Sequence, residues 1–163
     1  NLEIKINNSV NWKKKHFKSI QLNYKGAKFY KDYIEFFEKI YSMEWEYLSD
    51  LNEYILRYLL KILNIKVEIT KLSELNVSGV KSDLVLNVCK KLNAKKFIFG
   101  EQGKNYVKKD DFIKNDIKTI FQKYNHPAYE QLQGKFIPYL SVIDLLFNCG
   151  NESLKIINYN QNL

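Results

Sequence analysis

Near the C-terminus of this 163-residue chain, polar side chains able to carry out acid–base chemistry crowd into residues 126–150. The imidazole of His126 can move a proton or hold a ligand, and a hydrogen-bonded structural role is the alternative. Asp144 stands between Ile143 and Leu145, and an acid within an apolar run needs a hydrogen-bonding partner. This stretch is where we predict a functional site.

Ser141 precedes Asp144 by three positions, a spacing that places both residues on one face of a helix. In a purely structural interpretation, Ser141 is the N-cap of that helix and Asp144 bonds backbone groups of the preceding loop. The other polar residues of the stretch that we single out are Tyr129, Gln131 and Asn148.

A second candidate loop follows the apolar run that ends at Phe99. Gly100 and Gly103 allow the backbone to approach a ligand closely, and Lys104 can pair with an anion. The loop ends at Tyr106. The alternative is a tight turn whose glycines need positive φ.

The remaining reactive side chains carry weaker signals. Cys89 and Cys149 are the only cysteines, without a CxxC pair, so we predict no metal site. Cys149 is a weak candidate nucleophile, and Cys89 and His16 are expected in the core. No particular cofactor is indicated.

The elements that position these residues follow from hydrophobic periodicity. Residues 2–6 alternate as in a strand, and apolar spacing predicts helices from Trp12 to Tyr24, from about Phe29 to Tyr41, and from a cap at Ser49 to Ile62. Aromatic residues are frequent in these helices. The N-terminal third is therefore expected to be an aromatic-rich helical insertion.

The middle of the chain alternates between strand and helix patterns. Strands are predicted over 66–70, 96–99 and 117–121, with a helix from Ser82 to Leu92 and a helical turn at 110–111. This order is typical of a parallel, doubly wound sheet. We therefore expect one α/β domain over 1–163 with a three-layer, Rossmann-like parallel sheet, a helix from Ser141 to Gly150, and a frayed tail at 158–163.

The amino-acid composition limits the classes of molecule that the protein is expected to bind. The net charge is +8, but the lysines are dispersed and Arg57 is the only arginine, which makes nucleic acid an improbable partner. A surplus of lysines still attracts a small anion such as a nucleotide-sugar or an acyl-CoA. No apolar run is long enough for a membrane span, and two lone thiols without a signal peptide predict a cytoplasmic protein.

The C-terminal stretch resembles the signature of the WbqC-like family. The matching residues are His126-Pro127, Tyr129, Gln131, Gly134, Phe136, Pro138, Leu140-Ser141, Ile143-Asp144, Leu146-Phe147-Asn148 and Gly150. A second family segment is similar to the spacing of Trp12, His16, Ile20 and Tyr24. A third is similar to the run from Phe97 to Gly100 together with Gly103 and Tyr106. Phe99 and Leu84 depart from the family, which usually has Ser and Arg there. The family's N-terminal His-Gln-Pro segment is expected before this chain.

The resemblance implies a bacterial transferase of surface-polysaccharide (O-antigen) biosynthesis. Its substrate would be a nucleotide-activated amino sugar, modified by acyl or aminoacyl transfer. His126 would be the general base and Asp144 would orient it. The expected substrate-binding residues are Tyr129, Gln131, Ser141 and Asn148, with Gly100, Gly103, Lys104 and Tyr106 for phosphate. A non-catalytic binding or assembly protein, with buried and fully bonded His126 and Asp144 and no cleft, is the alternative.

Overall fold

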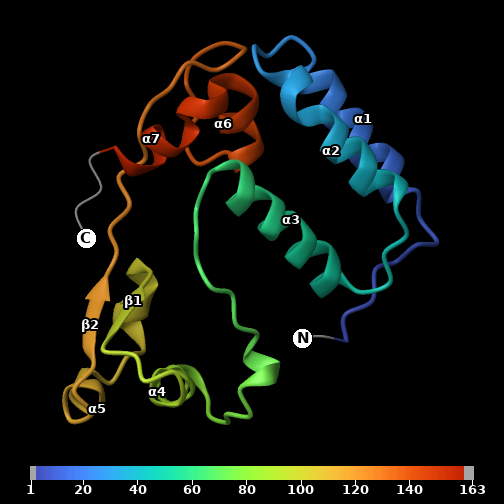
Figure 1. Cartoon of the computed structure of the whole chain (residues 1–163). Coiled ribbons are helices and arrows are strands. Elements are labelled where there is room, and N and C mark those ends of the chain that lie inside the picture. The colour runs from blue at the N-terminus through green and yellow to red at the C-terminus, as the bar shows by residue number, and fades with distance from the viewer. Residues whose placement is uncertain (1–2, 160–163) are drawn as a thin grey trace. The chain divides into compact units, whose positions relative to one another are not determined.

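The computed structural model describes residues 3–159, which form two compact units (Figure 1). Unit 1 consists of residues up to Lys66 and of the segment that begins at His126, and unit 2 of Val67–Asn125. Unit 1 is thus made of two pieces of sequence that are separated by unit 2. That both units act as one domain stays a prediction. In the described part of the chain, no helix is long and apolar enough to cross a membrane.

Unit 1 is helical. Its elements are α1 (Trp12–Tyr24), α2 (Tyr30–Ser42), α3 (Leu48–Ile62), α6 (Val142–Cys149), the 3₁₀ turn η3 (Gly150–Glu152) and α7 (Ser153–Asn158). Helices α1 and α2 run side by side and α2 contacts α6 (Figure 1). These bounds confirm the helices predicted at 12–24, 29–41, 49–62 and 141–150, although α3 starts at Leu48, with Tyr47 rather than Ser49 as its N-cap.

The core of unit 1 joins residues from both ends of the sequence. Phe147 on α6 is completely buried, and its ring lies 5.6 Å from that of Phe37 on α2 and 5.2 Å from that of Tyr24 on α1. The backbone N–H of Phe29 donates to the carbonyl of Phe147. The predicted aromatic stripe is therefore the surface on which α6 packs.

The predicted N-terminal strand is reduced to an antiparallel bridge. Lys5 pairs with Tyr47, and the flanking bonds run from Ile6 N to Glu46 O and from Leu48 N to Ile4 O. Leu2, the first residue of the predicted strand, lies outside the described residues, as do residues 160–163 of the predicted tail.

Unit 2 contains the 3₁₀ turn η1 (Leu72–Glu74), α4 (Lys81–Lys91), β1 (Lys96–Phe99), the 3₁₀ turn η2 (Glu101–Asn105), α5 (Lys109–Ile113) and β2 (Lys118–Phe121). Strands β1 and β2 pair in parallel, with Phe99 opposite Phe121. Its core consists of Leu86, Cys89, Phe99, Phe112 and Ile117. The predicted strand–helix–strand sequence over 96–121 is confirmed.

The predicted three-layer sheet is wrong. In the described residues the sheet has two strands only, and residues 66–70 belong to neither a helix nor a strand. Val67, an apolar residue of the predicted strand, is 59% exposed. The alternating pattern is typical of a strand, but a strand also requires a neighbouring strand to take up its backbone hydrogen bonds. The fold is a mostly helical α/β structure.

Candidate functional site

Asp144 is the centre of a hydrogen-bonded cluster at the N-terminus of α6. Its side chain is 4% exposed, and Oδ2 accepts from the hydroxyl of Tyr129 at 2.7 Å and from Nε2 of Gln131 at 2.9 Å. Nδ2 of Asn148 lies 3.3 Å from Oδ1 and 2.8 Å from the Asp144 carbonyl oxygen. All these groups donate to Asp144, and its position in the first turn of α6 adds the favourable field of the helix N-terminus. The partner that an acid in an apolar run requires is therefore present.

Two side chains fix the loop that precedes α6. Gln131 bonds both backbone groups of Ile137, donating to its carbonyl at 2.9 Å and accepting from its N–H at 2.8 Å. Ser141 is the N-cap of α6, and its Oγ accepts from the N–H of Ile143 at 3.4 Å. The structural interpretation of Ser141 is thus confirmed. Gln131 also donates to Asp144, so the same side chain ties the loop to the buried carboxylate.

The phenols beside Asp144 act as neutral donors. Burial raises the pKa of Tyr24 to about 12, and the charge and hydrogen bonding of Asp144 add to the effect. Burial and the hydrogen bond to Asp144 likewise raise the pKa of Tyr129 well above its usual range. Both hydroxyls keep their protons at neutral pH, because burial and then the neighbouring carboxylate disfavour the charged phenolate.

His126 lies at the start of the loop and is half-buried. Its Nδ1 is 2.9 Å from the carbonyl oxygen of Pro127, which can only accept, so Nδ1 carries a proton. In the neutral ring Nε2 then bears the lone pair, which is the form a general base requires. The ring lies 4.9 Å from that of Tyr139, 5.7 Å from Phe136 and 6.2 Å from Tyr129.

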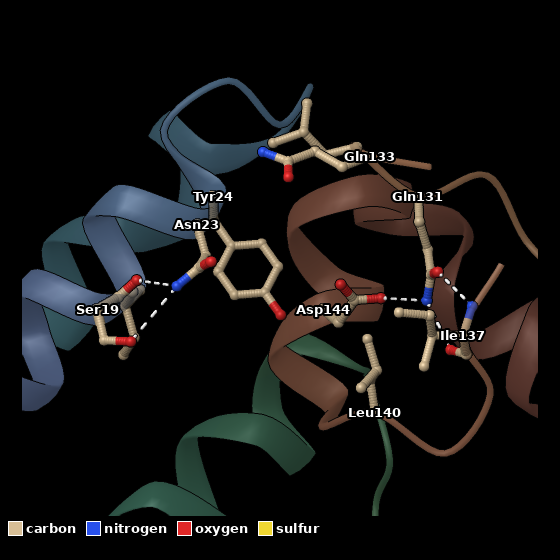
Figure 2. A pocket seen from close by; sticks show the side chains of 10 residues that line it. Ser19, Asn23, Tyr24, Gln131, Gln133, Ile137, Leu140 and Asp144 are labelled. Atoms are coloured by element: carbon tan, nitrogen blue, oxygen red, sulfur yellow. Dashed lines mark hydrogen bonds between the residues drawn. The ribbon is translucent and has the colours of Figure 1, made fainter. Parts of the chain in front are cut away.

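A pocket of about 360 Å³ opens beside Asp144 (Figure 2). Helix α1 forms one wall, and the loop of residues 131–140 forms the other. Figure 2 shows the hydroxyl of Tyr24 pointing toward Asp144 from the α1 side. The lining residues are Ser19, Ile20, Asn23, Tyr24, Gln131, Leu132, Gln133, Ile137, Leu140 and Asp144.

The pocket combines three side-chain amides, two hydroxyls and one carboxylate with aliphatic walls. Sequence reasoning missed the contribution of α1, because Tyr24 was considered only as part of the apolar spacing of a helix and Ser19 and Asn23 were not singled out. The i, i+4 spacing of Ser19 and Asn23, beside Ile20 and Tyr24, places these polar groups next to the core face and was the available signal. Such linings suit a ligand that is rich in hydroxyl or amine groups.

The candidate residues of unit 1 come together only in part. Tyr129, Gln131 and Asn148 all contact Asp144, whereas the ten residues that line the pocket do not include His126 or Tyr129. Tyr129 links the two parts, because its hydroxyl bonds Asp144 and its ring lies near His126. Any effect of Asp144 on His126 through these contacts would pass through Tyr129.

In unit 2, the loop from Gly100 to Tyr106 closes over Phe99. Gly103 is buried, and a Cβ there would lie 2.6 Å from Cβ of Phe99, so packing requires this glycine. Gly100 has φ −64° and open space around it. Neither glycine has positive φ, so that part of the tight-turn alternative is wrong. Lys104 and Tyr106 are exposed, and phosphate binding by this loop stays a prediction.

The two positions at which the sequence departs from the family pattern both belong to unit 2. Phe99 is 2% exposed and stacks with Phe121 in the core, so its ring fills space in the interior. Leu84 is half-buried on α4.

The thiols are not prepared for nucleophilic attack. Burial raises the pKa of Cys149, and the charge of Asp144 raises it further. Burial also raises the pKa of Cys89, which is 1% exposed. A raised pKa disfavours the reactive thiolate. Among residues 3–159, no group of three or more His, Cys, Asp or Glu side chains could hold a metal ion.

The fold and the pocket define a mostly helical α/β protein with a polar site between an N-terminal helix and a C-terminal loop-and-helix segment. The chain belongs to the WbqC-like protein family, whose model matches residues 2–156, and the resemblance is thereby confirmed.

A relative in Mycobacterium tuberculosis, "Uncharacterized protein Rv1507c", is 27% identical over 152 residues. The aligned part covers 92% of this chain, which spans 66% of the length of that relative. No solved structure matches the chain.

Proposed function

We propose that the chain is a transferase of surface-polysaccharide (O-antigen) biosynthesis that binds a nucleotide-activated amino sugar in the pocket beside Asp144. The observation that carries the proposal is the lining of this pocket, in which amides and hydroxyls converge on a buried carboxylate. Hydroxyl and amine groups of a sugar match such donors and acceptors, and the C–H faces of its ring match Ile20, Leu132 and Leu140.

The proposed reaction is acyl or aminoacyl transfer to the sugar. In acyl transfer from a thioester such as an acyl-CoA, the amine nitrogen forms a bond to the carbonyl carbon and the thiolate leaves. His126 takes the proton of the amine on Nε2, in keeping with its Nδ1–H donating to Pro127. Asp144 is a positioning residue that acts through Tyr129, and its negative charge attracts a cationic amine to the pocket.

Binding is tested with Asn23→Ala, which removes one amide from the pocket wall. Asn23 is exposed and donates to the Ser19 carbonyl at 2.8 Å, one helical turn before it. Asn115 in unit 2 makes the same contact with the Asp111 carbonyl at 2.7 Å, so Asn115→Ala is a matched control. We expect the first variant to bind UDP-glucosamine about tenfold more weakly by calorimetry, the effect of one hydrogen bond, and the control to bind normally.

Catalysis is tested with His126→Ala. Turnover of the amino sugar with an acyl-CoA panel, followed by mass spectrometry, should be abolished while the circular dichroism spectrum and the melting temperature stay close to those of the wild type. Unchanged turnover would remove His126 from the mechanism.

A non-catalytic binding or assembly protein of the same pathway is the second candidate. It is favoured by the mutual bonding of Asp144, Tyr129, Gln131 and Asn148, which is what a structural cluster requires. The pocket beside the cluster favours the first candidate. Tight binding of the sugar nucleotide without turnover by any acyl donor would decide for the second.

A further inference from the structure

Tyr139 has an unusual backbone conformation. Its φ of 61° lies in the left-handed region. Four of the six non-glycine residues with positive φ in the described chain are Asn or Asp, which tolerate this region, and Tyr139 is the aromatic one among them. A bulky side chain there costs free energy, and such strain is concentrated at functional sites.

Burial of the Tyr139 side chain contributes little stability to offset the cost of its backbone conformation. It is 73% exposed, and its ring meets that of His126 edge-on with 4.9 Å between centroids. An exposed aromatic ring held in a strained position is unfavourable for the isolated protein. It becomes favourable when a ligand covers the ring.

The neighbours of Tyr139 show where that ligand would lie. Ile137 and Leu140, on either side in sequence, line the pocket and are themselves 56% and 41% exposed. The edge of the pocket therefore continues along the chain to Tyr139 and, through its ring contact, to His126. A ligand larger than the pocket would cross this edge.

We propose that Tyr139 is a ligand-binding residue whose exposed ring packs against a face of the amino-sugar ring and holds the sugar amine beside His126. This inference rests on the proposed function. C–H groups on one face of a sugar ring make dispersion contacts with an aromatic ring, and the ring edge is left to hydrogen bonds. The contact would explain how a group bound at the pocket edge reaches His126, which is outside the pocket lining.

The test compares Tyr139→Asn with Tyr139→Phe. Asparagine tolerates the left-handed conformation and removes the ring, so we expect an unchanged or higher melting temperature and about tenfold weaker binding of UDP-glucosamine. Phenylalanine keeps the ring and should bind as the wild type does. Tyr159, which is 63% exposed, supplies the control Tyr159→Asn, for which normal binding is expected.

Each of the other outcomes would overturn either the inference about Tyr139 or the proposed function. Normal binding by Tyr139→Asn would overturn the inference and leave the proposed function standing. An equal loss of affinity for UDP alone would show that the nucleobase covers the ring, against the assignment to the sugar. A folded wild type that binds neither UDP-glucosamine nor glucosamine would overturn the proposed substrate class, and the inference with it.

Discussion

The two loops that the sequence marked as candidate sites are built in opposite ways. In unit 1, the loop before α6 is held by polar side chains that converge on Asp144, and a pocket lies beside them. In unit 2, the Gly100–Tyr106 loop is held by the close approach of Gly103 to the buried ring of Phe99. Glycines and polar residues had given both loops a similar appearance in the sequence.

The difference teaches how to weigh such signals. A glycine marks a place where backbone comes close to something, and here the partner of Gly103 is the core of its own unit. A buried carboxylate needs several donors, and these donors must be brought from different segments. In this chain the buried carboxylate, and not the glycines, marks the loop that has a pocket beside it.

The largest effect is expected when Asp144 is replaced by Ala. The donors Tyr129, Gln131 and Asn148 would lose their buried acceptor, so the free energy of unfolding should fall by about 3 kcal/mol in urea titrations. Asp83 is the matched control in unit 2, because it also lies in the first turn of a helix but has a half-exposed side chain paired with Lys108. Asp83→Ala should cost less than about 1 kcal/mol. Equal losses would mean that the cluster contributes no more than a surface pair.

A smaller effect is expected in the unit 2 loop. Gly103→Ala forces a methyl group against Phe99 and should lower the free energy of unfolding by about 2 kcal/mol. Gly100→Ala has open space and an extended backbone whose φ of −64° alanine adopts without strain, so it should be neutral or stabilising by about 0.5 kcal/mol. Hydrogen exchange in β1 and α5 would locate the change. If both variants are neutral, the loop is not held by packing on Phe99.

Alkaline pH should weaken the contact between Tyr24 and Asp144. Burial, and after it the charge of Asp144, raises the pKa of Tyr24 from its ordinary value of 10.0 to about 12, so the unfolded chain releases the proton first. The associated stability is therefore present below about pH 10 and is lost as the pH rises through about 12. The stability difference between wild type and Tyr24→Phe should shrink from pH 8 to pH 11. A constant difference would contradict the coupling.

The smallest effect concerns the two thiols, one in each unit. Cys149 is half-buried and Cys89 is 1% exposed, and both pKa values are raised. At pH 8 a disulfide reagent should modify Cys149 slowly and Cys89 only after unfolding, as peptide mass spectrometry would show. Rapid reaction of Cys89 would indicate that the core of unit 2 opens readily.

The sequence predicted the helices better than the sheet. Helices α1, α2 and α6 depend on local periodicity, so their limits are right to within a residue or two. The strands over 2–6 and 66–70 depend on a partner elsewhere in the chain. The first has only a bridge to Tyr47, and the second has no strand beside it in the described residues.

The part of the candidate site whose residues lie close together in sequence was predicted. The need of Asp144 for a partner and the capping by Ser141 follow from neighbouring residues, and both are present in the structure. The wall supplied by Ser19, Asn23 and Tyr24 lies more than one hundred residues away in sequence, so periodicity could not connect it to Asp144. A single sequence does not specify which helix face meets which loop.

The discontinuity of unit 1 has a consequence for synthesis on the ribosome. Phe147 and Leu146 complete the core around α2, but they emerge after the whole of unit 2. At about 5–20 residues per second, roughly four to sixteen seconds separate the end of α3 at Ile62 from the start of α6 at Val142. During this interval the aromatic face of α2 has no α6 to cover it, whereas residues 67–125 of unit 2 are completed before α6 begins. In the nascent chain, unit 2 is therefore expected to fold before unit 1.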